Sequence, residues 1–421
     1  MSENNSAVKA TKTIHDMTTG SPAKLIVQFM IPMFLGNIFQ QFYNVADSII
    51  AGQFLGVRAL AAIGSTGSLM FFVTGWLNGL SSGFAILVSQ WFGAKQYDRM
   101  RHYVAMSVYL ALGFALLMTI GFGFANEPIL RLMNYSDQIM PDVKAYMGII
   151  YAGLIVTAAY NSLAAFLRAL GDSKSPLYFL IISALLNIVL DLVLIIVFHL
   201  GAAGAAYATV IAQGVSALLC LVYIIKKVPI LKLDRWDFKL DGHLVRQQLA
   251  IGFPMALQYS ITAIGAMMVQ AALNVLGSVH VAAFTAANKI EQVATQVYVA
   301  LGTTMATYCA QNMGAGKYTR IRKGFKSATL IGFIYAVVTG VIIFFFGKYL
   351  SYLFISDNAA EVIPMVDIYV KCVAVFFIPL HFVNALRNGI QGMGYGLLPM
   401  LAGVAELAGR GITAMIAAAH K

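Results

Sequence analysis

The chain has 421 residues, of which 60% are hydrophobic and only 11% are charged, and its mean hydropathy is +0.78. Soluble domains have about 45–50% apolar and about 25% charged residues, so this composition excludes an ordinary soluble protein. The formal net charge of +11 does not indicate nucleic-acid binding, because the basic residues lie in short gaps between long apolar runs, as in polytopic membrane proteins.

Eleven apolar runs are each long enough to cross about 30 Å of hydrocarbon, which takes about twenty helical residues. We therefore expect an all-α, polytopic membrane protein. In chain order the runs cover residues 25–52, 59–91, 101–125, 142–168, 176–199, 203–226, 247–275, 281–310, 325–347, 362–390 and 396–419.

The polar gaps between these runs alternate in charge. The gaps on the side of the N-terminus hold nineteen Lys and Arg residues, whereas the opposite gaps and their margins hold four. Basic residues concentrate in cytoplasmic loops, so the N-terminus is predicted to be cytoplasmic. The first twenty residues are polar and do not resemble a signal peptide. The four opposite residues are Arg58, Arg131, Lys144 and Lys348.

The chain contains an internal duplication. Residues 89–101 (SQWFGAKQYDRMR) and 310–322 (AQNMGAGKYTRIR) are identical at six of thirteen positions, where chance gives about one. Pro32 also matches Pro254, at an offset of 222 residues. Six spans separate the copies, so they have the same orientation and are related by an axis along the membrane normal.

This repeat predicts two six-helix lobes in a parallel pseudo-two-fold arrangement with a cavity between them. The sixth run has no partner in the second half, and we interpret this as truncation of a twelfth helix; the alternative is eleven spans with an outer C-terminus. The expected domains are a cytoplasmic N-terminal tail (1–22), an N-lobe of six transmembrane helices (23–226), a cytoplasmic linker (227–246) and a C-lobe of five transmembrane helices (247–421).

Two acidic residues of the first half lie inside apolar runs, where an ionised carboxylate is costly and often marks an ion or substrate path. Asp47 and Asp191 are both about 8–12 Å from the outer ends of their helices, at about 1.5 Å per residue. Thr209 lies about 9 Å deep on the next run, so the three side chains are expected to converge. Asn44 and Asn187 precede the two aspartates by about one helical turn, on the same faces.

Carboxylate, amide and hydroxyl oxygens together can hold a hard cation such as Na⁺ or share protons. We therefore predict a coupling site for H⁺ or Na⁺ at Asp47 and Asp191, with no other metal and no cofactor. The alternative is that each acid is merely hydrogen-bonded and helps to pack its lobe.

The second half has different candidates. Glu291 has Met70 as its repeat counterpart, and is interpreted either as a substrate or proton site or as the partner of a cation on another helix. Glu406 and Arg410, spaced i,i+4, are expected to form a structural salt bridge. His381 is interpreted as a packing residue in preference to a proton relay.

Two further observations concern helix bending and catalysis. Pro32 interrupts the hydrogen-bond ladder of its helix and permits bending, which membrane bundles tolerate. The seven histidines form no HExxH motif, and no phosphate loop or nucleophile elbow is present, so no enzyme is expected. GAGKY at 314–318 is interpreted as a turn between helices.

The chain resembles the multidrug and toxic compound extrusion (MATE) family over its whole length, up to the missing last span. The resemblance rests on the paired Q-x-x-G-A loops, FYNVADSIIAGQFLG in the first run, the RALGDSKSP loop and LNIVLDL in the fifth run. It implies an antiporter with two six-helix lobes that exports organic, often cationic, drugs against an inward flow of H⁺ or Na⁺.

Within this family the chain looks like the DinF-type branch. The NorM-type branch has a carboxylate in its seventh span, and residues 251–275 contain none. The DinF-type resemblance implies a cation network in the N-lobe at Asp47, Asn187, Asp191 and Thr209, with Tyr146 and Asn161 as further members and Pro32 as the bend in the first helix.

We predict a cation-coupled multidrug efflux antiporter that works by alternating access. It is expected to be a monomer whose partners are small organic cations or drugs and membrane lipids, without nucleic acid. One alternative is a lipid-precursor flippase of the same superfamily, although such flippases usually have about fourteen spans; a second is a membrane scaffold that transports nothing. In the flippase, a phosphate would be received by buried cations, namely Lys289, Lys371, Arg387 and Arg410.

Overall fold

The computed structural model describes residues 14–133, 135–352 and 359–419, and every regular element in these ranges is helical. Arg58 lies in α1, but its side chain is outside what the structure describes. The elements are α1 (Pro22–Ser65), α2 (Gly67–Gly93), α3 (Tyr97–Leu132), α4 (Met140–Ala152), α5 (Leu154–Ala169), α6 (Lys174–Leu192), η3 (Val193–Val197), α7 (Gly201–Lys227), η4 (Pro229–Leu231), η5 (Arg235–Phe238), α8 (Gly242–Leu276), α9 (Ser278–Gly314), α10 (Tyr318–Ser351), α11 (Ala359–Gly392) and α12 (Leu397–Ala419).

Within the described ranges, nine helical segments are long and apolar enough to cross a membrane, or ten when the bent pair α4–α5 counts as one span. The sequence predicts eleven runs, and the difference is α9. This helix of 37 residues contains the predicted run 281–310 but also polar side chains such as Lys289, Glu291 and Gln292, which lower its hydropathy. A helix with a polar face can still lie in a bundle if that face meets protein or a water-filled cavity.

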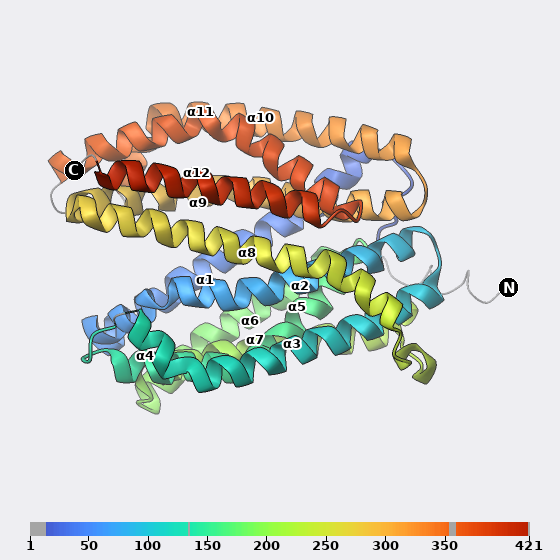
Figure 1. The fold of residues 1–421 in the computed structure, drawn as a ribbon, viewed down its shortest axis with the longest axis horizontal. Helices are drawn as coiled ribbons and strands as arrows, with labels where there is room; N and C mark the ends of the chain where they lie inside the picture. The colour runs from blue at the N-terminus through green and yellow to red at the C-terminus, as the bar shows by residue number, and fades with distance from the viewer. Residues whose placement is uncertain (1–13, 134, 353–358, 420–421) are drawn as a thin grey trace.

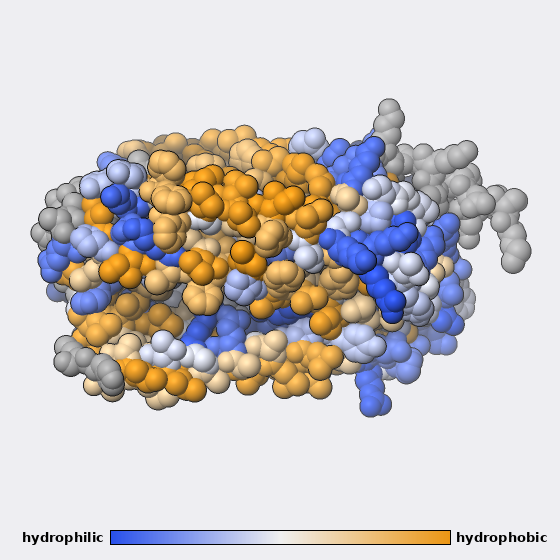
Figure 2. Space-filling model, turned by 90° about the horizontal axis from the view of Figure 1, so that it is seen from above, coloured by the Kyte–Doolittle hydropathy of each residue, from blue (hydrophilic) through white to orange (hydrophobic). Residues whose placement is uncertain are grey.

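The helices form two bundles that lie side by side, with their axes roughly parallel (Figure 1). Helices α2 to α7 belong to the N-lobe, and α8 to α12 belong to the C-lobe. The packing follows the repeat: α2 contacts α5 as α9 contacts α11, and α3 contacts α5 as α10 contacts α11. On the face that Figure 2 shows, hydrophobic residues cover much of the middle, and hydrophilic residues lie at both ends and are most extensive at the right-hand end. We name this the basic end, because it carries the described start of the chain and the turns rich in Lys and Arg.

Helix α1 does not belong to one lobe alone, and Figure 1 shows it crossing the bundle obliquely. Its first half packs on the C-lobe, where Phe29 is buried in a cluster with Leu301 and Met305 of α9. Its second half packs on the N-lobe, where Ile50 is buried in a cluster with Tyr146. Helix α1 therefore connects the two lobes mechanically.

Helix α8, the repeat counterpart of α1, belongs to the C-lobe and also packs on the N-lobe. Its residue Ala256 is buried against Leu80 and Phe84 of α2, which belongs to the N-lobe. A Cβ atom on Gly79 or Gly83 of α2 would collide with the backbone of α8. These glycines thus allow two helices from different lobes to approach at backbone contact.

The interruption of α1 occurs at Gly56, whereas the helical conformation continues through Pro32. Gly56 has φ 79° and ψ −179°, and Gly277, its counterpart at an offset of 221, has φ 104° and ψ 171°. Only glycine adopts such dihedrals readily. In both repeats the first long helix therefore ends at a glycine with a similar backbone conformation. Bending at Pro32 stays a prediction about another conformational state of the protein.

The two repeated loops meet at the basic end in a reciprocal contact. Gln90 Nε2 donates to Gly392 O at 3.1 Å, and Gln311 Nε2 donates to Ala169 O at 2.9 Å. Gly392 is the counterpart of Ala169, since 392 − 169 = 223. We name this contact the glutamine clasp and define it by Gln90, Gly93, Gln311 and Gly314; a Cβ on either glycine would collide with the backbone oxygen of the glutamine in the other lobe.

The described start of the chain is tied into the same joint. Met17 N donates to Gln311 Oε1 at 2.8 Å, and Lys317 Nζ donates to Thr18 O at 2.9 Å. Arg320 Nη2 also donates to Met17 O at 3.1 Å. Residues that the sequence predicts to be part of a cytoplasmic tail are therefore docked against the C-lobe.

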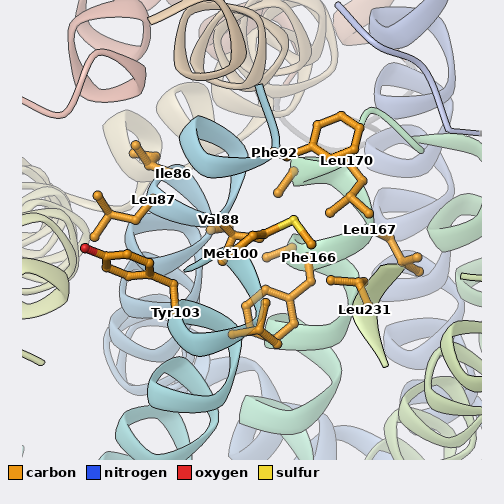
Figure 3. Close-up of a cluster of buried hydrophobic side chains, with 14 of the residues drawn as sticks. Ile86, Leu87, Val88, Phe92, Met100, Tyr103, Phe166, Leu167, Leu170 and Leu231 are labelled. Atoms are coloured by element: carbon orange, nitrogen blue, oxygen red, sulfur yellow. The ribbon is translucent and has the colours of Figure 1, made fainter. Parts of the chain in front are cut away.

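Beside the clasp, a buried apolar cluster fills the basic end of the N-lobe (Figure 3). Phe92 of α2, Met100 of α3, Phe166 of α5 and Leu231 of η4 meet there, each at most 5% exposed. Four separate elements thus share one core, which supports the clasp from the N-lobe side.

Candidate functional site

Helices α1, α6 and α7 bring the predicted ion-site residues together in the N-lobe. The side chains of Asp47 and Asp191 lie close enough for their carboxyl groups to interact electrostatically. Asp191 is 1% exposed and Asn187 is fully buried, whereas Asp47 is partly buried. The two acids come from helices 144 residues apart in the chain, since 191 − 47 = 144.

Tyr43 joins this group, although sequence reasoning did not select it. Its hydroxyl lies 3.2 Å from Thr209 Oγ1 and is also within reach of Asp47. The Thr209 hydroxyl also lies 3.0 Å from Ala205 O, and either hydroxyl can be the donor of the bond between Tyr43 and Thr209. Tyr43 precedes Asp47 by four residues, and this i,i+4 spacing was the signal that could have identified it.

The group contains more buried acceptors than donors. Both oxygens of Asp191, Oδ1 of Asp47 and both amide atoms of Asn187 are buried without a hydrogen-bond partner. Among the ion pairs of the described residues, none involves either aspartate. Buried polar groups are normally satisfied, so this cluster of orphaned oxygens has the chemistry to take up a proton or a cation.

The remaining predicted residues divide into members and non-members of this group. Tyr146 of α4 lies within electrostatic range of both aspartates, and its hydroxyl also contacts Met70 Sδ at 3.5 Å. The Asn44 side chain is exposed, because its helix presents Tyr43 and Asp47 to the site instead. Asn161 of α5 is partly buried, and no contact places it in the group.

Several polar side chains of the C-lobe have partners within the same lobe. Tyr369 donates to Glu291 Oε2 at 2.8 Å, so the partner of Glu291 is a hydroxyl and not a cation. Lys371 Nζ lies 2.6 Å from Asp367 Oδ2. The predicted Glu406–Arg410 salt bridge is present, at 2.5 Å. Lys289 is exposed, and His381 is fully buried in the packed interior of the lobe.

A cavity of about 220 Å³ lies between the lobes, next to the glutamine clasp. Helices α2 and α5 of the N-lobe and α8, α9 and α11 of the C-lobe form its wall. Two arginines line it, Arg168 of α5 and Arg387 of α11. Within the described part of the chain, no group of three or more His, Cys, Asp or Glu side chains is arranged to hold a metal ion.

Comparison with known proteins agrees with the two repeats. The model of the family MatE matches residues 32–193 and 250–413, one segment in each lobe. The probable multidrug resistance protein YpnP of Bacillus subtilis is 32% identical over 395 residues, which cover 92% of this chain and 86% of YpnP. The multidrug export protein MepA of Staphylococcus saprophyticus is 25% identical and is covered over 83% of its length, by 93% of this chain.

The fold also agrees with solved structures. A crystal structure of MATE in complex with MaL6 superimposes with a TM-score of 0.89 at 23% identity, over 96% of this chain and 91% of that one. At this level of identity the likeness concerns the arrangement of the helices alone.

Proposed function

The chain belongs to the MatE family of multidrug transporters, and from this premise we propose that it is an antiporter which exports organic compounds by alternating access in exchange for H⁺ or Na⁺. The proposal includes the expected orientation, in which the basic end faces the cytoplasm of a bacterial cell. The assignment to the DinF-type branch and the monomeric state stay predictions.

The observation that supports coupling best is the Asp47–Asp191 pair. Two carboxyl groups face each other in a largely buried position, with no basic partner among the described residues. Two neighbouring negative charges repel each other strongly in a medium of low dielectric constant, so a shared proton or a bound Na⁺ would be needed to stabilise the pair.

Helix α1 supplies a route from this pair to the lobes. Asp47 lies on the half of α1 that packs on the N-lobe, and Phe29 lies on the half that packs on the C-lobe. A change in the contact between Asp47 and Asp191 therefore shifts a helix that both lobes hold. An ion that binds one arrangement of α1 better than the other would change the populations of the two states.

The test uses purified protein in lipid vesicles with an imposed proton or sodium gradient. Fluorescein and rhodamine 123 are the probes, and transport of either dye is scored as transport activity. Asp47→Asn and Asp191→Asn are each expected to abolish gradient-driven transport while the protein still inserts into the membrane. The gradient that drives the wild-type protein identifies the coupling ion.

Asp367→Asn is the matched control, because it removes an aspartate of the C-lobe whose partner is Lys371 at the edge of the bundle. It is expected to transport at the wild-type rate. Wild-type transport by both variants of the Asp47–Asp191 pair would overturn the proposal, and lipid scrambling without transport of either dye would favour the flippase.

A further inference from the structure

The charges of the cavity between the lobes differ from those expected for a site that binds organic cations. Arg168 and Arg387 are in its wall, and the residues that line it include no Asp or Glu. A cationic ligand would therefore meet two like charges. We propose that this cavity binds an organic anion, with an acidic group between the two arginines and an apolar body against the rest of the wall; this rests on the proposed export function and names its substrate class.

Arg168 lies in the last turn of α5, and none of the ion pairs among the described residues includes it. Its titratable neighbours are the neutral side chains of Tyr160, Cys220 and Tyr259. An unpaired guanidinium that faces a cavity is a binding group for a carboxylate, sulfonate or phosphate, because its planar fork of donors matches their oxygens.

Arg387 is only partly neutralised. Its Nη1 lies 3.6 Å from Glu406 Oε2, while the other oxygen of Glu406 accepts from Arg410 at 2.5 Å. One carboxylate thus serves two arginines. The Nε atom of Arg387 is buried without an acceptor, and the side chain as a whole is 19% exposed. Together with Arg168, which has no ion pair among the described residues, these three arginines and one acid leave a formal excess of 3 − 1 = 2 positive charges.

The two arginines of the cavity come from different lobes, but both interact electrostatically with one residue. Tyr259 of α8 lies within electrostatic range of both guanidinium groups. Beside it, Gln391 Nε2 donates to Gln258 Oε1 at 2.6 Å, so these buried amides are satisfied and do not compete for the ligand. An acidic group near the Tyr259 hydroxyl would be held by the N-lobe and the C-lobe at once.

The rest of the wall suits an apolar body. Part of the cavity surface is formed by Phe71 and Ile86 of α2, Met255 of α8 and Val299 of α9. Burial of an apolar group against such side chains is favourable, and a methionine adapts to ligands of different shape. The cavity therefore fits an amphiphilic acid better than a small inorganic anion.

The experiment measures dye binding to the purified full chain by fluorescence polarisation, without an ion gradient. Fluorescein carries a free carboxylate, and rhodamine 123 has the same ring system with a positive charge. The wild-type protein is expected to bind fluorescein at least about tenfold more tightly than rhodamine 123, since charge-assisted hydrogen bonds discriminate by about this factor. The opposite preference would overturn the proposal.

Arg168→Gln and Arg387→Gln test the two groups separately. Each is expected to weaken fluorescein binding about tenfold and to leave rhodamine 123 binding unchanged or stronger. Lys371→Gln is the control, because it removes a cation that pairs with Asp367 outside the cavity wall. Arg387→Lys retains the charge and should restore part of the affinity. Unchanged fluorescein binding in both glutamine variants would also overturn the proposal.

Competition separates the two sources of an acidic ligand. Displacement of fluorescein by 1-naphthoate indicates a soluble organic acid, and displacement by dihexanoyl phosphatidic acid indicates a lipid head group; displacement by neither contradicts the proposed site. Failure of ion coupling and failure of this inference are therefore distinguished, because the first affects gradient-driven transport and the second affects equilibrium binding.

Discussion

The N-lobe and the C-lobe are copies of one helical unit, yet their polar side chains are arranged differently. In the N-lobe, Asp47 and Asp191 face each other without a basic partner. In the C-lobe, Glu406 pairs with arginines and Glu291 accepts from a tyrosine hydroxyl. Duplication has preserved the backbone conformation at equivalent glycines of both copies, while among the described residues the pair of neighbouring aspartates is found in the N-lobe only.

The repeat positions make this contrast specific. Asp47 corresponds to Met268 or Val269, at offsets of 221 and 222, and Asp191 corresponds to Ala414, at an offset of 223. The C-lobe therefore lacks both acids at the equivalent places. The joint between the lobes therefore uses equivalent residues of both copies, whereas the proposed ion site uses acids of one copy only.

The largest effect is expected at the glutamine clasp, where the two lobes are most alike. Gly93→Leu and Gly314→Leu each place a side chain where the backbone of the other lobe lies. The clasp then cannot close, so transport of either dye in vesicles should be abolished. Gly121→Leu is the control, since a Cβ at this exposed position of α3 meets nothing within 4 Å. Normal transport by both clasp variants would show that the contact is dispensable.

The next largest effect is expected from the two aspartates of the N-lobe site, which take part in none of the ion pairs among the described residues. Asp47→Asn and Asp191→Asn are each expected to lower gradient-driven transport at least about 100-fold. Because the two groups act as one unit, the double variant should be no slower than either single variant. Initial rates of dye transport measure this. Independent, multiplicative losses would mean that the aspartates serve separate sites.

A smaller effect is expected from the shared acid of the C-lobe. Glu406→Gln removes the carboxylate that partly neutralises Arg387 and Arg410. The cavity then carries one more uncompensated positive charge, so fluorescein should bind several-fold more tightly. Fluorescence polarisation gives the affinity, and Glu361→Gln, at an exposed position of α11, serves as the control. A weaker affinity would mean that Glu406 positions Arg387 for binding.

The smallest effect should distinguish the two glutamines of the clasp. Gln90→Ala removes one hydrogen bond between the lobes, and Gln311→Ala removes a second bond as well, to Met17. A neutral hydrogen bond contributes about 1 kcal/mol, which is about a fivefold change in an equilibrium. Spin labels at positions 96 and 323, in a chain without its native cysteines, report the fraction with separated basic ends. Gln311→Ala should increase that fraction more than Gln90→Ala.

Much of the fold follows from the order of residues alone. Hydrophobic runs of about twenty residues must be helices in a bilayer, because the backbone has no other partner there. The repeat of residues 89–101 in 310–322 predicts two lobes and also identifies the loops that form the clasp. The count of spans does not follow from hydropathy alone, because polar side chains within α9 lower the hydropathy of that helix.

The site could be predicted in part. Asp47, Asp191 and Thr209 were selected because charge inside an apolar run is costly, and equal depths suggested that they meet. The sequence prediction included Asn44 in the site but not Tyr43, because a spacing of about one turn does not decide which neighbour of Asp47 faces the partner helix. The basic cavity was not predicted, since Arg168 and Arg387 are far apart in the chain and near the ends of their apolar runs.

The sequence by itself determined a membrane-embedded, duplicated, all-helical chain with two costly acids in its first half, because hydropathy, charge asymmetry and repeat spacing are properties of the linear chain. The tertiary structure decided which side chains share a space: Tyr43 with Thr209, Gln90 with Gly392, and the arginines of two lobes around Tyr259. The physical reason is that packing in three dimensions brings together groups whose separation along the chain carries no signal of their contact.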